Sequence, residues 1–231
     1  MKTVLITGGT VRLGKAIAAR LKAEGWRVIT SSHRADAGAD IVVDLAEPMG
    51  AVKLYAEALK LLGGNPPDAL VNNAALFTGD DAALAAVNLE APKKLTTLMA
   101  GRETGLGAVV NILDSGILGS LESMGSAPVV SKGSAVSNVS NDPKRLYLFS
   151  KCELAAFTRS AAATFAATLR VNAVAPGPVL APTEVHTKAG EMLLDHRPRP
   201  DDVAAAVSYL LSAESTTGAI IPVDSGQHLL H

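Results

Sequence analysis

The sequence has very little of several features that would indicate particular classes of protein. It contains one cysteine, Cys152, so no intrachain disulfide can form and no cysteine cluster is available for a structural metal site. No apolar run is long enough to cross a bilayer, and the run after Lys2 is too short for the core of a signal peptide. We therefore expect a cytoplasmic protein with no metal and no membrane partner.

Neither sign of charge is in excess. The chain has 21 Lys and Arg residues against 22 Asp and Glu residues, and this balance argues against a nucleic-acid partner. Hydrophobic residues make up 48% of the 231 positions and charged residues 19%, so the chain can bury a core instead of staying disordered. This length suits one sizeable core, and we predict a single domain over residues 1–231.

Short β-branched runs alternate with longer Ala- and Leu-rich segments of helical period, which is typical of βαβ folds. Each short run is almost continuously apolar, as buried parallel strands require. The pattern predicts a doubly wound, Rossmann-type α/β domain with a seven-stranded parallel sheet and helices on both faces. The expected strands are Thr3–Thr7, Arg27–Ser31, Ile41–Val43, Ala69–Val71, Ala108–Leu113, Arg170–Val174 and Ala219–Val223. The expected helices are Leu13–Glu24, Met49–Leu61, Asp81–Met99, Leu146–Thr168 and Asp201–Ser212.

Two segments lack this periodicity. Residues 115–146 are rich in Ser and Gly, and residues 176–200 contain five prolines. Long loops in compact domains are usually either functional or disordered. We expect the first segment to be a loop inserted at the active site and the second to be a substrate loop.

A glycine-rich turn from Thr7 to Gly14 follows the first expected strand and opens the first helix. Glycines at such a turn let the backbone approach a pyrophosphate, and the helix N-terminus supplies unpaired N–H groups. The spacing differs from the G-x-G-x-x-G fingerprint, and a tight turn with no ligand is the alternative. Its position at the start of an alternating α/β chain favours a dinucleotide site.

The end of the second expected strand indicates which dinucleotide this is. A site for NAD places an acidic residue there, whereas this chain has Ser32, His33 and Arg34. An arginine suits a 2′-phosphate, so the sequence favours NADP(H). Asp36, two residues further on, argues against this choice, and a solvated surface pair of His33 and Arg34 is the alternative.

Tyr147 and Lys151 are four residues apart in the longest expected helix, so they share one face of it. A neighbouring ammonium favours the phenolate, and we expect it to lower the pKa of Tyr147 from its usual value near 10. A phenol tuned in this way can exchange protons at neutral pH. A surface pair is the alternative, but the combination with the glycine-rich turn favours an active site.

Together these motifs resemble the short-chain dehydrogenase/reductase family over essentially the whole chain. The resemblance also rests on Asp44 and Leu45 after the third expected strand, Asn72 to Ala75 after the fourth, and Pro176 and Gly177 after the sixth. It implies that Tyr147 is the proton donor, that Lys151 lowers its pKa and binds the nicotinamide ribose, that Asn88 helps to hold a proton-relay water, and that the protein is a homotetramer. The implied cofactor-binding residues are Gly8, Thr10, Arg12, Leu13, Gly14, Ser32, His33, Arg34, Asp44, Leu45, Asn73, Ala74, Lys151, Pro176 and Gly177.

Three departures from the usual pattern narrow the resemblance. Asp114 stands where most members have a serine, Arg12 replaces the middle glycine of the turn, and Phe77 follows the Asn-Asn-Ala-Ala run. With Ser-His-Arg after the second strand, these residues resemble the pteridine reductases. A carboxyl group can relay a proton to a ring nitrogen, and an aromatic ring can stack on a flat substrate. The expected substrate is a pterin or dihydropterin, contacted by Arg12, Phe77, Asp114 and Tyr147.

Each departure also has a structural explanation. Asp114 could cap the following loop, Phe77 could belong to the core, and Arg12 could serve the pyrophosphate alone. The insertion between Asp114 and Tyr147 could also reshape the substrate pocket. Two other functions therefore stay open, namely a carbonyl reductase acting on a ketone or 3-oxoacyl substrate and a non-catalytic NADP-binding sensor.

Overall fold

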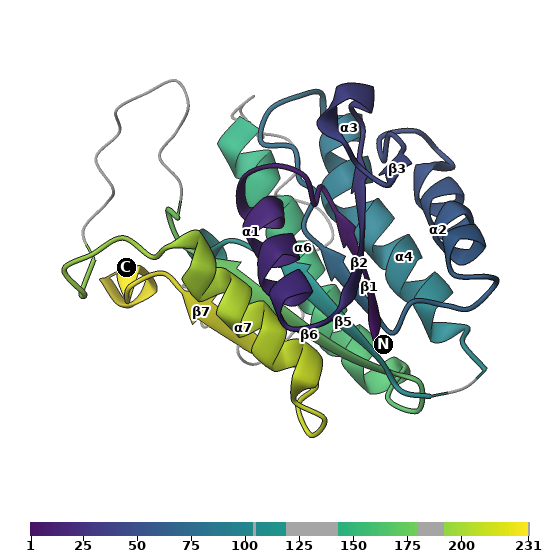
Figure 1. The fold of residues 1–231 in the computed structure, drawn as a ribbon. Helices are drawn as coiled ribbons and strands as arrows, with labels where there is room; N and C mark the ends of the chain where they lie inside the picture. Colours follow the sequence, from purple (N-terminus) through teal and green to yellow (C-terminus); the bar gives the residue numbers. More distant parts are fainter. Residues whose placement is uncertain (104, 119–142, 180–191, 231) are drawn as a thin grey trace.

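A computed structural model describes residues 1–103, 105–118, 143–179 and 192–230 (Figure 1). Most of the expected inserted loop, residues 119–142, lies outside the described residues. The same holds for residues 180–191 of the expected substrate loop. The sequence-based expectations for these two segments therefore stay predictions.

Seven parallel strands form one sheet in the order β3-β2-β1-β4-β5-β6-β7. This confirms the predicted doubly wound α/β architecture. β6 continues two residues beyond its predicted end, and the other strand ends lie within one residue of the prediction. The strands are β1 Thr3–Thr7, β2 Arg27–Ser32, β3 Ile41–Val42, β4 Ala69–Asn72, β5 Gly107–Ile112, β6 Leu169–Pro176 and β7 Ile220–Val223.

Helices connect the strands and cover both faces of the sheet. Among the described helices, none combines the length and the apolar character needed to span a membrane. The α-helices are α1 Arg12–Ala23, α2 Gly50–Leu61, α3 Asp81–Ala85, α4 Ala91–Ala100, α6 Pro143–Thr164 and α7 Pro200–Ser212. The other helical turns are η1 Ala35–Ala37, the π-helical η2 Ala86–Glu90, η3 Ser115–Ile117 and η4 Gln227–Leu230.

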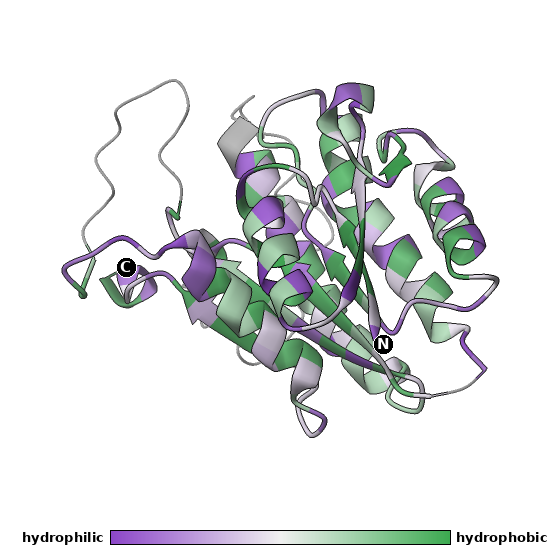
Figure 2. Ribbon diagram, in the orientation of Figure 1, coloured by the Kyte–Doolittle hydropathy of each residue, from purple (hydrophilic) through white to green (hydrophobic). Residues whose placement is uncertain are grey.

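Side chains of each strand alternate between two buried cores. Leu5 of β1 packs with residues of α2, α4 and α6, whereas its neighbours Val4 and Ile6 pack with residues of α1 and α7. Figure 1 shows α1 and α7 on one face of the sheet, and Figure 2 shows apolar strands between helices with polar outer sides. Burial on both faces explains why the strand sequences are almost continuously apolar.

The structure corrects the boundaries of two expected helices. The run predicted as Asp81–Met99 contains the wide π turn η2 in its middle. The helix predicted as Leu146–Thr168 begins at Pro143 and ends at Thr164. Proline suits a helix's first turn, because its missing N–H would have no partner there. At the other end, the Phe165 carbonyl accepts from Thr168 N and Leu169 N, which turns the chain into β6.

These changes also shorten the expected inserted loop. Residues 115–117 form η3 and residues 143–146 belong to α6, so both ends of the segment 115–146 have helical structure. The prediction of loop over the whole segment was therefore wrong at its two ends. The Ser- and Gly-rich composition concealed two short structured pieces that are anchored by residues outside the segment.

A buried arginine joins β6 to the C-terminal end of α7. Arg170 Nη1 donates to the carbonyls of Leu210 and Ala213 at 2.7 and 2.8 Å, and its Nη2 donates to the carbonyl of Leu211 at 2.7 Å. The last carbonyls of a helix have no partner within the helix. Arg170 therefore satisfies them from the sheet and fixes α7 against β6.

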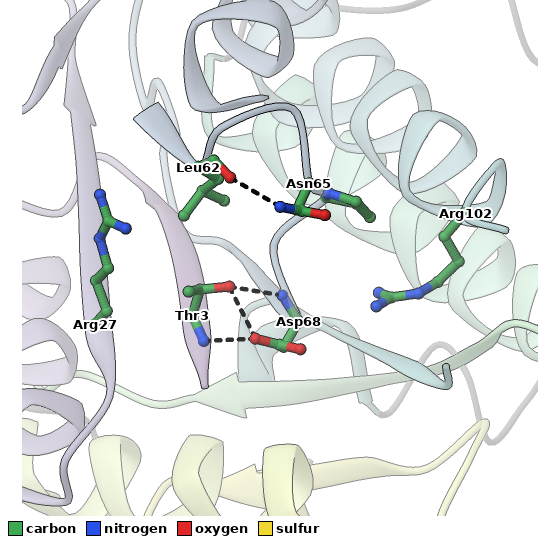
Figure 3. Close-up of a pocket in the computed structure, with 7 residues that line it drawn as sticks. Thr3, Arg27, Leu62, Asn65, Asp68 and Arg102 are labelled. Carbon is green, nitrogen blue, oxygen red and sulfur yellow. Dashed lines mark hydrogen bonds between the residues drawn. The ribbon is translucent and has the colours of Figure 1, made fainter. Parts of the chain in front are cut away.

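A polar cavity of about 350 Å³ lies at the amino ends of β1, β2 and β4 (Figure 3). Its polar groups bond to one another or to nearby backbone. Asp68 Oδ2 accepts from Thr3 N and Oγ1 at 2.7 and 2.9 Å, and Arg27 Nη2 donates to the Leu61 carbonyl at 2.8 Å. These bonds tie the strand ends together, whereas the predicted site residues lie at the opposite edge. The lining residues are Thr3, Arg27, Leu62, Asn65, Pro66, Asp68 and Arg102.

Candidate active site

The strand order reverses between β1 and β4, because the chain connections leave these two strands in opposite directions, and ligands of open α/β sheets usually bind at the carboxyl ends of the strands at such a point. The glycine-rich turn follows β1, and Asn73 and Ala74 follow β4. Asn73 Nδ2 donates to the carbonyls of Thr7 and Gly8, both at 3.0 Å. Thr7 Oγ1 accepts from Asn73 N at 3.0 Å and Ala74 N at 2.9 Å. The two motifs predicted to bind the cofactor are thus held together as one unit.

The geometry of the turn fits a pyrophosphate. Gly8 has a φ of +62°, which favours glycine, and a Cβ on Gly14 would lie 2.1 Å from the Gly8 carbonyl oxygen. Within the described chain, the buried Thr10 Oγ1 has no hydrogen-bond partner, so its hydroxyl is available to a phosphate oxygen. Arg12 and Leu13 open α1, whose first turn has no acidic residue. The arrangement suits an anion at this helix N-terminus.

The end of β2 lies next to this turn, since Gly9 N donates to the Ser31 carbonyl at 3.2 Å. Ser32 is the last residue of the strand, and its Oγ accepts from Arg34 N at 3.1 Å. His33 and Arg34 are exposed. The structure therefore brings the predicted 2′-phosphate residues to the edge of the expected dinucleotide site.

Arg34 forms an ion pair with Asp36, which the sequence suggested only as a residue that argues against NADP(H). Its Nε lies 3.0 Å from Asp36 Oδ1, and its Nη2 lies 2.6 Å from Asp36 Oδ2. The hydrogen bonds and charge of this pair raise the pKa of Arg34 and lower the pKa of Asp36. The arginine expected to bind a 2′-phosphate is thus already in a two-point ion pair.

Two further predicted cofactor positions lie at the same edge. Asp44 follows β3, and its Oδ1 accepts from Ala46 N at 2.8 Å, while Leu45 beside it is buried. Pro176 ends β6 and Gly177 follows it. The carboxyl ends of β1, β2, β3, β4 and β6 therefore all carry predicted cofactor residues.

Lys151 is buried in α6 and points to the end of β5. Its Nζ donates to the Ile112 carbonyl at 2.8 Å and lies 5.6 Å from the centroid of the Tyr147 ring. Burial lowers the pKa of Lys151 to about 8, although the charge of Asp114 acts in the opposite direction. The ammonium is therefore held in the fold by a backbone carbonyl and a nearby carboxylate.

The tyrosine differs from expectation. Burial raises the pKa of Tyr147 above its ordinary value, and the charge of Asp114 and a hydrogen bond from the Tyr147 hydroxyl to Asp114 raise it further. The expectation that Lys151 lowers the pKa of Tyr147 is therefore wrong for this structure. The physical reason is that burial disfavours the charged phenolate, and the nearby Asp114 carboxylate disfavours it further.

Asp114 has two roles in the structure. Its φ of −150° is extended, and its Oδ1 accepts from Gly116 N at 2.8 Å, so the residue caps η3 as the structural explanation proposed. The same carboxylate interacts with the Tyr147 phenol and raises its pKa. Capping fixes the side chain, and the fixed side chain reaches the phenol.

Phe77 lies beside Tyr147 and outside the core. The centroids of the Phe77 and Tyr147 rings are 5.0 Å apart, and the ring planes are tilted by 55°. Phe77 is 54% exposed, so the proposed explanation of this residue as part of the core is wrong. An exposed aromatic ring against a tyrosine offers a flat surface to a ligand.

Asn88 reaches the site through the backbone before Phe77. The asparagine is fully buried in η2. Its Nδ2 donates to the Leu76 carbonyl at 2.8 Å, and its Oδ1 accepts from Leu76 N at 2.8 Å. This amide pair fixes the chain one residue before Phe77, so the side chain of Asn88 helps to position the aromatic ring.

No role was predicted from the sequence for two buried polar groups below the site, Asn111 and Thr158. Asn72 Nδ2 donates to Asn111 Oδ1 at 2.8 Å, and Asn111 Nδ2 donates to Thr158 Oγ1 at 2.9 Å. This buried series links β4, β5 and α6 below the site. A polar residue inside an apolar strand was the available signal for Asn111. No sequence signal marks the Ile112 carbonyl that accepts from Lys151, because every residue has one.

Comparison with known proteins agrees with this geometry. The family model described as "Enoyl-(Acyl carrier protein) reductase" matches residues 11–228. Protein FixR of Bradyrhizobium diazoefficiens is 31% identical over 99% of this chain and 87% of its own length. The granaticin polyketide synthase putative ketoacyl reductase 2 of Streptomyces violaceoruber is 32% identical over 98% of this chain and 96% of its own.

The fold of a solved structure is also similar to this chain over almost its whole length. FolM alternative dihydrofolate reductase 1 from Brucella canis, crystallised with NADP, has a TM-score of 0.78 and 30% identity. The similarity covers 99% of this chain and 94% of that protein. The family match over nearly the whole chain and these full-length relatives lead to one conclusion. The chain belongs to the short-chain dehydrogenase/reductase family of oxidoreductases.

Proposed function

We propose that this protein is an NADPH-dependent reductase of a pterin or dihydropterin ring. The observation that carries the proposal is the placement of the Asp114 carboxylate against the Tyr147 phenol, whose ring packs on the exposed ring of Phe77 at 5.0 Å. Reducing a ring C=N bond requires a proton on nitrogen, which a carboxyl group can relay and a serine hydroxyl supplies poorly. The similarity to a FolM alternative dihydrofolate reductase supports the same substrate class.

The cofactor is NADP(H). Bound NADPH supplies a hydride to a ring carbon. The glycine-rich turn with Thr10 and Arg12 holds the pyrophosphate, and Arg34 beyond β2 meets the 2′-phosphate. The NADP in the Brucella canis relative supports this choice. The proposed binding residues are Gly8, Thr10, Arg12, Leu13, Gly14, Ser32, His33, Arg34, Asp44, Leu45, Asn73, Ala74, Lys151, Pro176 and Gly177.

The chain's own residues manage the proton. Asp114 is partly exposed, so it can take a proton from solvent and pass it to a ring nitrogen. The neutral Tyr147 hydroxyl holds the carboxylate in place and keeps a second proton at the site. Lys151 fixes the end of β5 through the Ile112 carbonyl. Hydride on carbon and a proton on nitrogen convert C=N into CH–NH and leave NADP⁺.

In this proposal, Phe77 and Arg12 bind the flat substrate beside Asp114 and Tyr147. Phe77 offers a ring for stacking, which contributes on the order of 1 to 3 kcal/mol for nucleobases. Arg12 is exposed at the start of α1 with a φ of +48°, a backbone conformation that is uncommon for residues other than glycine. We assign Arg12 to the substrate as well as to the pyrophosphate.

The test follows NADPH oxidation at 340 nm with a 7,8-dihydropterin and with a 3-oxoacyl thioester. The wild-type chain should oxidise NADPH with the dihydropterin, and Asp114→Ser should slow this reaction about 100-fold or more. NADPH affinity should change much less, because Asp114 acts on the proposed cofactor residue Lys151 only through its charge. Glu103→Gln, which removes one exposed carboxylate at the opposite edge of the sheet, is the matched control.

A second candidate is a carbonyl reductase acting on a ketone or 3-oxoacyl substrate. The Streptomyces violaceoruber relative, named as a putative ketoacyl reductase, favours it. Ketone reduction that survives Asp114→Ser, with no reduction of dihydropterins, would establish this candidate and reject the first. NADPH binding without turnover of either substrate would instead favour the non-catalytic sensor, which the intact Tyr147 and Lys151 argue against.

Assembly and location are separate proposals. The family resemblance implies a homotetramer, and native mass spectrometry of the full chain should give four times the subunit mass. A dimer or monomer at micromolar concentration would contradict it. Cell fractionation that places the protein with cytoplasmic markers tests the expected location.

A further inference from the structure

We propose that Asp36 limits the preference of this protein for NADPH over NADH by competing with the 2′-phosphate for Arg34. The inference rests on the proposed function, because it concerns the same cofactor. Its basis is the two-point ion pair in which Asp36 accepts from Arg34 Nε at 3.0 Å and from Nη2 at 2.6 Å. The Asp36 carboxylate therefore already occupies two N–H donors of the Arg34 guanidinium, which we assign to the 2′-phosphate.

The pair lies at the place where the 2′-phosphate is expected. Gly9 N bonds to the Ser31 carbonyl, which joins the glycine-rich turn to the end of β2. Ser32 Oγ accepts from Arg34 N at 3.1 Å and fixes the arginine backbone just beyond the strand. The side chains of Arg34 and Asp36 are 60% and 70% exposed. Because both are open to solvent, a ligand can reach either partner without unfolding the loop.

Carboxylate and phosphate compete for the same donors of a guanidinium. Arginine presents five N–H groups in a planar fork, and both anions bind best to two of them at once. A 2′-phosphate thus meets an arginine that is partly occupied and an Asp36 carboxylate of the same sign as itself. NADH brings a neutral ribose hydroxyl to this place, and a carboxylate does not oppose it. Asp36 should therefore weaken NADPH binding selectively.

The test measures the affinities of NADPH and NADH for the full chain by isothermal titration calorimetry at low ionic strength, where surface charges are least screened. Asp36→Asn should lower the Kd for NADPH about threefold to tenfold and leave the Kd for NADH within about twofold. Glu57→Gln is the matched control. It removes the same charge from an exposed pair with Lys60 on α2, and it should change neither Kd.

A second variant separates competition from simple repulsion. Arg34→Ala should raise the Kd for NADPH about tenfold or more, and Asp36→Asn should tighten NADPH less in that background than in the wild type. An unchanged ratio of the two affinities in Asp36→Asn, or equal tightening of both cofactors, would overturn the inference alone. A wild-type chain that binds neither cofactor would overturn the proposed function together with it.

Discussion

Burying the charged Lys151 side chain lowers the free energy of unfolding, so replacing this residue by methionine should stabilise the protein. Burial lowers the pKa of Lys151 from 10.5 to about 8. At about 1.4 kcal/mol for each pKa unit, the folded state loses about 3 kcal/mol to the buried ammonium at pH 7. Methionine keeps the length of the side chain but loses the hydrogen bond to the Ile112 carbonyl, worth about 1 kcal/mol. The expected net gain at pH 7 is about 2 kcal/mol.

The sign of the effect makes it depend on pH. Below about pH 8 the lysine is protonated in both the folded and the unfolded wild type, so the full cost is present. Between about 8 and 10.5 the unfolded chain holds a proton that the folded protein has released, and wild-type stability rises with pH. Above this window the wild type no longer bears the cost. The advantage of Lys151→Met should therefore disappear as the pH rises.

Urea unfolding at pH 7, 8.5 and 10, followed by circular dichroism, measures this difference. Lys15→Met, at an exposed position of α1, is the control and should show no comparable pH dependence. Lys151→Met should also lose NADPH-dependent activity, which separates stability from function. A variant that is less stable than the wild type by the same amount at all three pH values would refute the reasoning.

Three other substitutions should each affect a different property, namely stability, cofactor affinity or catalytic efficiency. Arg170→Met should destabilise the protein by about 3 kcal/mol in urea unfolding, because it leaves carbonyls at the end of α7 without partners; a loss below about 1 kcal/mol would contradict this. Gly14→Ala should raise the Kd for NADPH more than about tenfold in calorimetry, since its Cβ would collide with the Gly8 carbonyl. Asn88→Ala should lower kcat/KM for the dihydropterin about tenfold with little change in NADPH affinity, and an equal loss of both would contradict its role in positioning Phe77.

The sheet could be predicted almost completely from the sequence, because burial on both faces requires continuous apolar runs such as Thr3–Thr7. Both ends of α1, α2 and α7 lie within one residue of the prediction, but those of α6 could not be predicted. The start of α6 at Pro143 falls in a Ser- and Gly-rich segment without periodicity, and its end is fixed by backbone hydrogen bonds from residues after Phe165. Local composition indicates only the helix propensity of a segment, whereas the C-terminal end of α6 also depends on where β6 begins.

The structure brings the predicted site residues to the carboxyl edge of the sheet, where their role stays a prediction, and the pairs that they form were harder to predict than the residues themselves. The glycine-rich turn and the proximity of Tyr147 to Lys151 could be predicted because each involves residues that are close together in the sequence. The predicted direction of the pKa of Tyr147 was wrong because it depends first on burial of the phenol and then on Asp114, which comes from a different element, and neither can be predicted from the Tyr147–Lys151 spacing. The two-point pair of Arg34 and Asp36 was likewise visible only as two nearby charges, and its geometry needed the structure.

In the proposed reductase, the aspartate at position 114 changes the proton chemistry of the site. Its charge favours both the neutral phenol of Tyr147 and the ammonium of Lys151, which a serine hydroxyl would not do. In the proposed function, Phe77 and Arg12 would contribute binding energy that many flat or anionic ligands could share. The carboxylate is needed only where the product gains a proton on nitrogen. Asp114→Ser should therefore separate the two candidate substrates more sharply than any change at Phe77 or Arg12.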